Sequence, residues 1–418
     1  MSSRPRLLFL SGLFPLPVRS GGQQRTMHLL RALQQRFDVT VVTHAAQPGF
    51  EAHLDALRRS VTRLHVVVPR NMQGPLPRFL YKVWFWTRRL TSAEPSDRFY
   101  NNVGNVRRVV DRELADPSYD VVFCMYWFWH ARVYAAPPLK VIDTNDVQTE
   151  RQAEFLARSR NVVDKILGSV FLRSYRKREA ATLRRADLLV AVTSKDRETL
   201  QAMAGPAAEV IVVPTGIDTD HLCPQPLEPD MREIVFFGAL RNRMNQDAVP
   251  YLVREILPRI AARLPDVRLT LVGSSPTAEM HQLAAHDPRV HITGFVEDLR
   301  PVLGRAGLVV CPLRFAYGIR GRILEVLSLG VPVVATPVAV DGMGVTAAAG
   351  VVLADDAQSF ADAVVEILAH PARRAELSRQ GRDFAVANAS LAATFGRLAD
   401  DLANRVAIPG AAASERVR

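Results

Sequence analysis

The fold is decided by the stretch from Arg6 to Thr43, in which three patterns follow one another. The apolar run "RLLFL" (Arg6–Leu10) leads through a loop rich in glycine and proline to "QQRTMHLLRALQQRF" (Gln23–Phe37), and "VTVVT" (Val39–Thr43) comes next. The two short apolar runs predict buried strands, and the segment between them has a helical pattern. The order strand, helix, strand predicts a βαβ unit.

The same alternation continues along the chain and predicts two α/β domains of the doubly wound type. Further strands are expected at "LHVVV", "DVVFCM", "LKVID", "DLLVAVT" and "VIVVP", and then at "EIVFFG", "RLTLVG", "VHITG", "GLVVCP" and "VPVVAT". A length of 418 residues agrees with two domains, since single hydrophobic cores rarely grow so large. We expect domains at 1–218 and 233–390, a linker rich in Pro, Gly and Asp at 219–232, and a crossover helix and tail at 391–418.

Composition and cysteine spacing are those of an ordinary folded protein, and we expect neither a metal nor a cofactor. Hydrophobic residues make up 48% of the chain and charged residues 23%, which is typical of globular proteins. Cys124, Cys223 and Cys311 show neither CxxC nor CxH spacing, so the pattern argues against a disulfide framework or structural zinc. It suits a reducing compartment.

The early apolar run is interrupted by Gly12, Pro15 and Pro17, which argues against a secretory signal. No apolar stretch reaches the roughly 18 residues that a membrane-spanning helix needs. We therefore expect a cytoplasmic protein.

Residues 1–200 hold 32 Lys and Arg against 18 Asp and Glu, whereas residues 201–418 hold 21 against 24.

This basic excess favours anionic partners, but no nucleic-acid recognition pattern accompanies it, so we expect no nucleic acid. "RFLYKVWFWTRRL" (Arg78–Leu90) suits either peripheral contact with an anionic membrane or a core-facing helix with solvated arginines.

Ligands of doubly wound sheets bind where strands end and helices begin. In the second half, "YGIRGRILEVLSLG" (Tyr317–Gly330) places Arg320 and Arg322 at the start of a helix predicted from about Gly321 to Leu329. Free N–H groups there favour phosphate oxygens, and Glu325 could accept hydrogen bonds from sugar hydroxyls. Alternatively, Glu325 merely suits the helix dipole and pairs with Arg322.

Two further strand ends carry polar residues. "FFGALRNRMNQDA" (Phe236–Ala248) combines a glycine turn, Arg241 and Arg243, and Asn245 as the expected N-cap of a helix; these arginines could grip a diphosphate or simply be solvated. "VIDTNDVQTER" (Val141–Arg151) ends a strand with Asp143, Asn145 and Asp146. One aspartate there could cap the next helix, and the polar groups could reach a substrate hydroxyl.

Taken together, the chain resembles the GT-B glycosyltransferases, in particular the retaining family 4 group with its bacterial exopolysaccharide-type sugar transferases. The resemblance is carried in family order by "FPLPVRSGGQQRTMHLLRAL", "ADLLVAVTSKDRETL", "VIVVPTGID", "FFGAL", "LPDVRLTLVGSSP", "VHITGFVEDLRPVLGRAGLVVCPLR" and "GIRGRILEVLSLGVPVVAT". It implies two Rossmann-like domains facing across a cleft, with a C-terminal helix that crosses back to the first domain.

The resemblance also implies an activity: a sugar moves from a nucleotide-sugar donor to a glycan, lipid-linked or small-molecule acceptor, with retention of configuration and without a metal. The donor would be held mainly by the second domain and the acceptor mainly by the first. The implied donor-binding residues are Gly21, Gly22, Gly238, Arg241, Asn245, Tyr317, Gly318, Ile319, Arg320, Arg322 and Glu325, and the candidate catalytic residues are Asn145 and Asp146. Localisation is expected in the cytoplasm, with the inner face of the membrane as a possible peripheral site.

Three positions depart from the family pattern. Tyr317 stands where the first acid of a Glu-x7-Glu pair is common, Arg243 or Asn245 where a lysine is frequent, and Asn145 where many relatives have histidine. We therefore expect the donor sugar to be held differently here. Two alternatives stay open: a GT-B-shaped nucleotide-sugar epimerase, and a catalytically silent subunit that binds nucleotide or glycan.

Overall fold

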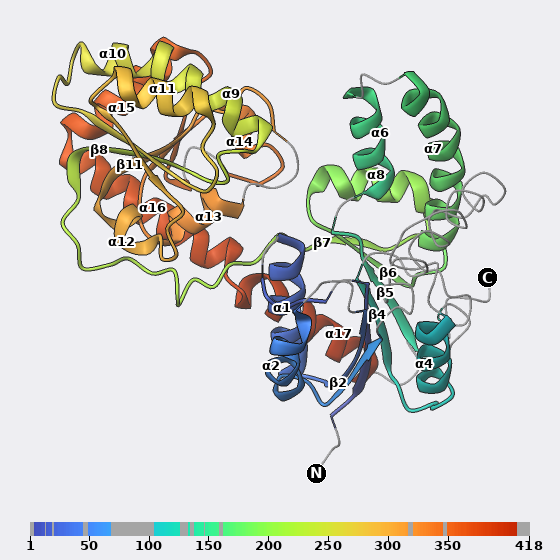
Figure 1. Cartoon of the computed structure of the whole chain (residues 1–418). Coiled ribbons are helices and arrows are strands. Elements are labelled where there is room, and N and C mark those ends of the chain that lie inside the picture. Colours follow the sequence, from blue (N-terminus) through green and yellow to red (C-terminus); the bar gives the residue numbers. More distant parts are fainter. Residues whose placement is uncertain are drawn as a thin grey trace. The chain divides into compact units, whose positions relative to one another are not determined.

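The computed structural model describes residues 4–12, 14–18, 21–44, 49–67, 104–125, 133, 138–145, 147–158, 162–316, 321–345 and 349–407. The chain divides into two compact units, the first made of Met1–Pro214 with Phe395–Arg418 and the second of Thr215–Thr394. Each unit is built on one parallel β-sheet flanked by helices (Figure 1).

The sheet of the first unit has seven parallel strands in the order β3-β2-β1-β4-β5-β6-β7. They are β1 (Arg6–Ser11), β2 (Asp38–His44), β3 (Arg63–Val67), β4 (Val121–Met125), β5 (Leu139–Asp143), β6 (Leu188–Ala191) and β7 (Val210–Val212). The strand order reverses between β1 and β4, which is the arrangement of doubly wound sheets. All seven strands lie where the sequence predicts them.

The helices of the first unit come from both ends of the chain. They are α1 (Gly21–Gln34), α2 (Leu54–Arg59), α4 (Gly104–Leu114), α6 (Gln148–Arg158), α7 (Val162–Leu183), α8 (Ser194–Ala204) and α17 (Arg397–Ala407), with a 3-10 turn at Phe50–His53. Leu398 and Leu402 of α17 are buried, and Asp400 forms an ion pair with Arg36 just after α1. The predicted return of the C-terminal helix to the first domain is confirmed.

The sheet of the second unit has six parallel strands in the order β10-β9-β8-β11-β12-β13. They are β8 (Asp230–Phe237), β9 (Arg268–Val272), β10 (Val290–Gly294), β11 (Ala306–Cys311), β12 (Val333–Ala335) and β13 (Val351–Leu353). Five were predicted. The sequence analysis missed β13, a three-residue strand at the edge of the sheet.

Helices cover both faces of this second sheet (Figure 1). They are α9 (Arg243–Tyr251), α10 (Leu257–Ala261), α11 (Ala278–His286), α12 (Arg300–Arg305), α13 (Gly321–Ser328), α14 (Pro337–Val340), α15 (Ala357–Ala369) and α16 (Pro371–Ala389). A π-helical turn at Leu252–Ile256 joins α9 to α10, and a second at Ala392–Gly396 precedes α17. The prediction of two doubly wound α/β domains is therefore confirmed.

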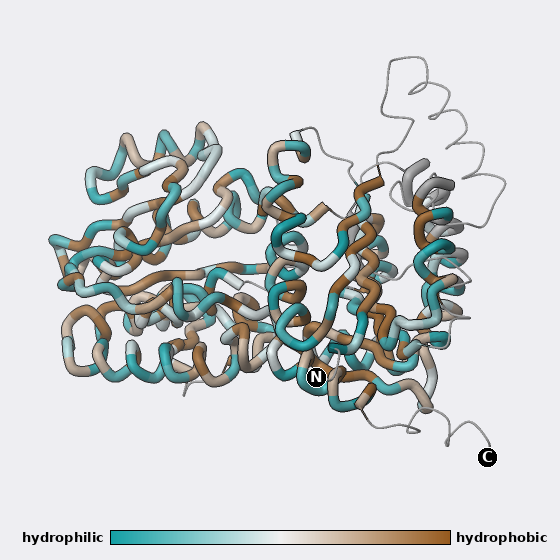
Figure 2. Tube along the Cα trace, turned by 90° about the horizontal axis from the view of Figure 1, so that it is seen from below, coloured by the Kyte–Doolittle hydropathy of each residue, from teal (hydrophilic) through white to brown (hydrophobic). Residues whose placement is uncertain are grey.

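The two cores lie along the sheets. β4 and β11 are buried at every residue, as expected of parallel strands covered on both faces. Figure 2 shows the strands of the first unit as hydrophobic segments between more hydrophilic helices. Among the described residues, no helix combines the length and the apolar character that a membrane span requires.

Within the second unit, the incoming and outgoing segments of the chain lie side by side. The Ile217 N–H donates to the Ala389 carbonyl at 2.8 Å, and the Leu391 N–H donates to the Ile217 carbonyl at 3.1 Å. A parallel bridge between Ile217 and Ser390 results. Both connections to the first unit therefore start from one paired segment.

Candidate functional site

Three neighbouring strands of the second sheet end in glycines with positive φ. Gly238 follows β8 with φ 144°, Gly273 follows β9 with φ 154°, and Gly294 ends β10 with φ 73°. Backbone hydrogen bonds join these ends: Gly238 N–H donates to Val272, and Gly273 N–H donates to the Gly294 carbonyl at 2.8 Å. A Cβ on Gly273 would lie 1.8 Å from the Gly238 oxygen. Glycine therefore makes this close backbone packing possible.

Arg322, in the first turn of α13, reaches beneath the Gly238 turn. Its Nη1 donates to the Phe237 carbonyl at 2.6 Å, and its Nη2 donates to Asn245 Oδ1 at 3.3 Å and to Cys311 Sγ at 3.6 Å. A Cβ on Gly238 would lie 2.2 Å from Nη1. This guanidinium thus links α13 to β8, β11 and α9.

The prediction that Asn245 caps its helix is wrong. Helix α9 begins at Arg243, and Asn242 is the N-cap, with its side chain accepting from the Met244 N–H at 3.3 Å. Asn245 is instead buried inside the first turn, where its Nδ2 donates to the Ala239 carbonyl at 2.9 Å. It stabilises the β8–α9 turn together with Arg322.

The starts of α9 and α13 were both predicted to hold phosphate. An ion pair connects α9 to the loop that follows β11. Arg314 in this loop binds Asp247 of α9, with Nε 2.9 Å from Oδ2, and its guanidinium lies over the Tyr251 ring at 5.0 Å. The sequence analysis named neither residue of this ion pair. Hydrogen bonding to Asp247 raises the pKa of Arg314, so it remains a cation.

The remaining predicted donor residues of this unit fall into two groups. Arg241 and Arg243 are exposed at the start of α9, and Glu325 is partly exposed on α13, which begins at Gly321 as predicted. Tyr317, Gly318, Ile319 and Arg320 lie outside the described residues. Phe295, not singled out by the sequence analysis, follows Gly294, and the residue is 76% exposed.

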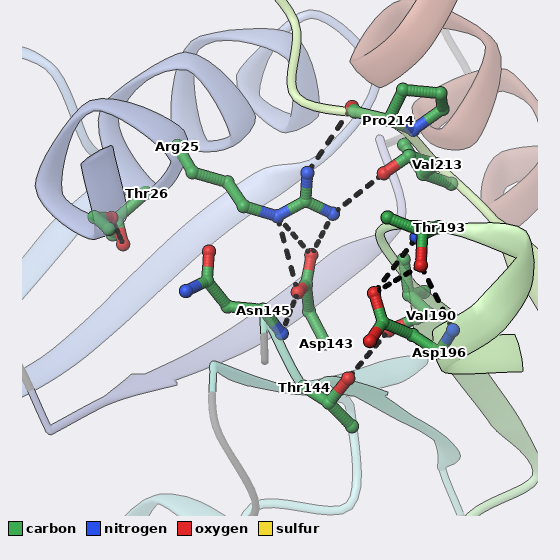
Figure 3. A network of polar contacts seen from close by, with 11 residues as sticks. Arg25, Thr26, Asp143, Thr144, Asn145, Val190, Thr193, Asp196, Val213 and Pro214 are labelled. Atoms are coloured by element: carbon green, nitrogen blue, oxygen red, sulfur yellow. Dashed lines mark hydrogen bonds and ion pairs between the residues drawn. The ribbon is translucent and has the colours of Figure 1, made fainter. Parts of the chain in front are cut away.

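In the first unit, Arg25 and Asp143 form a completely buried ion pair at the carboxyl end of β5 (Figure 3). Arg25 Nη2 lies 2.8 Å and Nε 3.1 Å from Asp143 Oδ2. The guanidinium also donates to the carbonyls of Val213 at 3.1 Å and Pro214 at 3.2 Å. Asp143 was singled out from the sequence, but its partner Arg25 was not.

Asn145, a predicted catalytic residue, sits in a tight turn beside this pair. Its φ of 52° is left-handed, and its N–H donates to Asp143 Oδ1 at 2.9 Å. The preceding Thr144 is fixed to β6, since its hydroxyl donates to the Val190 carbonyl at 3.3 Å. Asp146 lies outside the described residues.

Gly21 and Gly22 form the first turn of α1. A Cβ on Gly21 would meet no atom within 4 Å, and the Gly22 carbonyl accepts from the Thr26 hydroxyl at 2.8 Å. Arg25 follows on the same helix. The two glycines and the Asn145 turn are thus connected through Arg25 and Asp143.

Backbone N–H groups at the start of α6 are hydrogen-bonded by a side chain of the protein itself. The buried Glu179 carboxylate accepts from the backbone N–H groups of Gln148 and Thr149, each at 3.1 Å, and from the Thr149 hydroxyl. Burial is the largest influence on Glu179 and raises its pKa. Two backbone N–H groups of this helix start are therefore occupied by an internal carboxylate.

No group of three or more His, Cys, Asp or Glu side chains suited to a metal ion occurs in the part of the chain that the structure describes.

Two family descriptions match the sequence. "Glycosyltransferase Family 4" matches residues 19–221, and "Glycosyl transferases group 1" matches residues 231–370. A curated relative, the GDP-mannose-dependent alpha-(1-6)-phosphatidylinositol monomannoside mannosyltransferase of Mycolicibacterium smegmatis, is 30% identical over 248 residues. That alignment covers 53% of this chain and 63% of the relative, which is less than two thirds of its length.

Solved structures share the fold at low sequence identity. Sucrose-phosphate synthase from Thermosynechococcus elongatus is 18% identical with a TM-score of 0.64, over 96% of this chain and 99% of that one. The Anabaena protein HepE in complex with UDP is 16% identical with a TM-score of 0.61, over 96% of this chain and 100% of that one.

Proposed function

Because this chain belongs to the glycosyltransferases of the GT-B fold, we propose that it transfers a sugar from a nucleotide-sugar donor to an acceptor. The observation that carries the proposal is the edge of the second sheet, where three glycine-ended strands lie beside the start of α9. Backbone N–H groups at a helix N-terminus suit a diphosphate.

The proposed donor site combines backbone and side chains of the second unit. Gly238 lets the turn pack closely over the Arg322 guanidinium, Arg241 contributes positive charge, and Asn245 supports the turn from beneath. Glu325 accepts hydrogen bonds from the ribose hydroxyls. Tyr317, Gly318, Ile319 and Arg320 complete the site by analogy with the family, as do Gly21 and Gly22 from the first unit.

We assign Arg322 a different part in the same site. Its guanidinium is already engaged by the Phe237 carbonyl and Asn245. It therefore positions the β8–α9 turn, and the contact with phosphate falls to the exposed Arg241.

The proposed reaction retains the configuration of the sugar and uses no metal. It needs stabilisation of a departing nucleoside diphosphate, and preorganised cations and helix N-termini can supply this. Asn145 and Asp146 of the first unit are proposed to act at the reacting sugar and acceptor. The left-handed Asn145 turn lies at the carboxyl edge of β5, where doubly wound sheets place functional residues.

For the donor and acceptor, the curated relative gives the first candidates to test. Its name specifies GDP-mannose and a phosphatidylinositol monomannoside, so we propose GDP-mannose as donor and a lipid-linked glycan as acceptor. A lipid-linked acceptor would agree with the basic excess of residues 1–200 and with a cytoplasmic protein that contacts the inner face of an anionic membrane.

The proposal predicts a nucleotide-sugar that stabilises the protein and is consumed. We would compare GDP-mannose, UDP-glucose and dTDP-glucose by thermal shift, and then measure transfer to lipid and glycan acceptors. Arg241→Ala combined with Glu325→Gln should weaken donor binding at least about tenfold, because charge-assisted hydrogen bonds are lost. Arg379→Ala, an exposed arginine on α16, is the matched control.

Two outcomes would contradict this assignment. If the double variant binds the donor as tightly as the wild type, the donor site does not lie at this edge of the sheet. If no nucleotide sugar stabilises the protein, the proposed activity is wrong. Release of an altered free sugar without an acceptor would instead identify an epimerase. Binding without any turnover would identify a silent subunit.

A further inference from the structure

One guanidinium in the first unit contacts three separate segments. Arg25 binds Asp143 at the end of β5, the Val213 and Pro214 carbonyls after β7, and the ring of Phe395, which lies 5.1 Å from its carbon Cζ. Pro214 is the last residue of the first unit before the chain leaves it, and Phe395 is the first residue after its return. Arg25 therefore meets both connections at their first-unit ends.

The burial of this pair points to a geometric role. Both side chains are 0% exposed. Removing two charges from water costs free energy, so a buried ion pair often contributes no more stability than apolar residues of similar volume. The pair does fix the relative orientation of the groups that it joins, because the planar guanidinium of an arginine fits its acceptors in few orientations.

The Asp143 carboxylate connects Arg25 to the Asn145 turn, because it accepts hydrogen bonds from both. Asp143 Oδ1 accepts from Asn145 N–H at 2.9 Å and lies 3.3 Å from Arg25 Nε. Figure 3 shows the Asn145 side chain turned away from this pair. A left-handed non-glycine residue is held in place by its surroundings, and here the Asp143 carboxylate accepts a hydrogen bond from its backbone N–H.

We propose that Arg25 is a positioning residue that, through Asp143, fixes the Asn145 turn and both chain connections of the first unit in one arrangement. Only the expected effect on turnover rests on the proposed function; the positioning role itself does not. Arg25 touches no substrate. Its replacement should lower turnover while the donor, which we propose is held mainly by residues of the second unit, keeps its affinity.

The first test is kinetic. In Arg25→Lys the charge remains but the fork is lost, so we expect kcat to fall at least about tenfold with donor affinity unchanged within about twofold. Asp143→Asn should behave in the same way. The matched control is Lys140→Met, which removes a partly buried ion pair of β5, formed with Asp187 at 3.0 Å. It should leave kcat close to that of the wild type at equal folded fraction.

The second test does not depend on activity. Amide hydrogen exchange should increase in peptides that cover 143–147, 210–217 and 390–398 of Arg25→Lys, and these peptides should stay protected in Lys140→Met. Unchanged exchange in all three peptides would overturn the inference, as would a variant that loses donor affinity together with kcat. If the wild type transfers no sugar, the proposed function fails, whereas the exchange experiment still decides the positioning role.

Discussion

The guanidinium of Arg322 lies between the ends of β8 and β11, and Gly238 leaves the space that it occupies. Gly238 has φ 144°, and a Cβ there would lie 2.2 Å from Arg322 Nη1. Arg322 in turn gives the Phe237 carbonyl its hydrogen bond. Arginine and glycine therefore depend on each other, 84 positions apart by subtraction of their numbers.

This dependence predicts that substitutions at the two positions are not additive. Arg322→Lys should cost about 1–3 kcal/mol of unfolding free energy, because it weakens the bond to a buried carbonyl. Gly238→Ala should cost a similar ~1–3 kcal/mol from its backbone conformation and from displacing the guanidinium. The double variant should cost less than the sum, since lysine leaves more room. Urea unfolding measures all three, and strict additivity would contradict the contact.

At the scale of elements, strand β2 ends in a buried histidine. His44 is 5% exposed at the carboxyl end of the strand, and burial lowers its pKa from 6.5 to about 4. The folded protein therefore keeps this imidazole neutral at pH values where the unfolded chain has already protonated it. His44 therefore makes the stability of the folded protein sensitive to acid.

His44 predicts loss of stability as the pH falls from about 6.5 towards 4. In that window the unfolded chain binds a proton that the folded chain does not, so the unfolding free energy falls with decreasing pH. The shift corresponds to at most roughly 3 kcal/mol. Denaturant unfolding at several pH values should show a smaller slope in His44→Gln than in the wild type. Equal slopes would mean that His44 is protonated in the folded state.

At the scale of the whole molecule, the first unit is completed by the last part of the chain. Phe395, Leu398 and Leu402 are all 2% exposed or less, and Arg405 of α17 binds Glu209, with Nη1 2.9 Å from Oε2. The second unit, Thr215–Thr394, is continuous in sequence. The two units therefore depend differently on the C-terminus.

Deletion of residues 395–418 should unfold the first unit and leave the second folded. Each large buried side chain removed costs ~2–5 kcal/mol, and the sum approaches the whole stability of a typical domain. Hydrogen exchange by mass spectrometry should show lost protection in β1, β4 and β5 but not in β8, β9 and β11. A deletion of 408–418 alone, which keeps α17, is the control. Protection retained in β4 would show that α17 is dispensable.

The sequence by itself determined the strands other than β13, their alternation with helices and the glycines at strand ends. These features are local: a buried parallel strand needs a short apolar run, and a turn with positive φ favours glycine. For the same reason the start of α13 at Gly321 was predicted correctly. Local rules were weakest where one element offered several similar residues, as with Asn242 and Asn245 at the start of α9.

Only the tertiary structure decided which charged residues are exposed and which hold the fold together. Arg25 and Asp143 are 118 positions apart, and Arg322 is 85 positions from Phe237. Arg241 and Arg322 look alike in sequence, yet one is exposed and the other is bound beneath a glycine turn. Such contacts depend on strand order and on helix placement over each sheet, and no local period records either one.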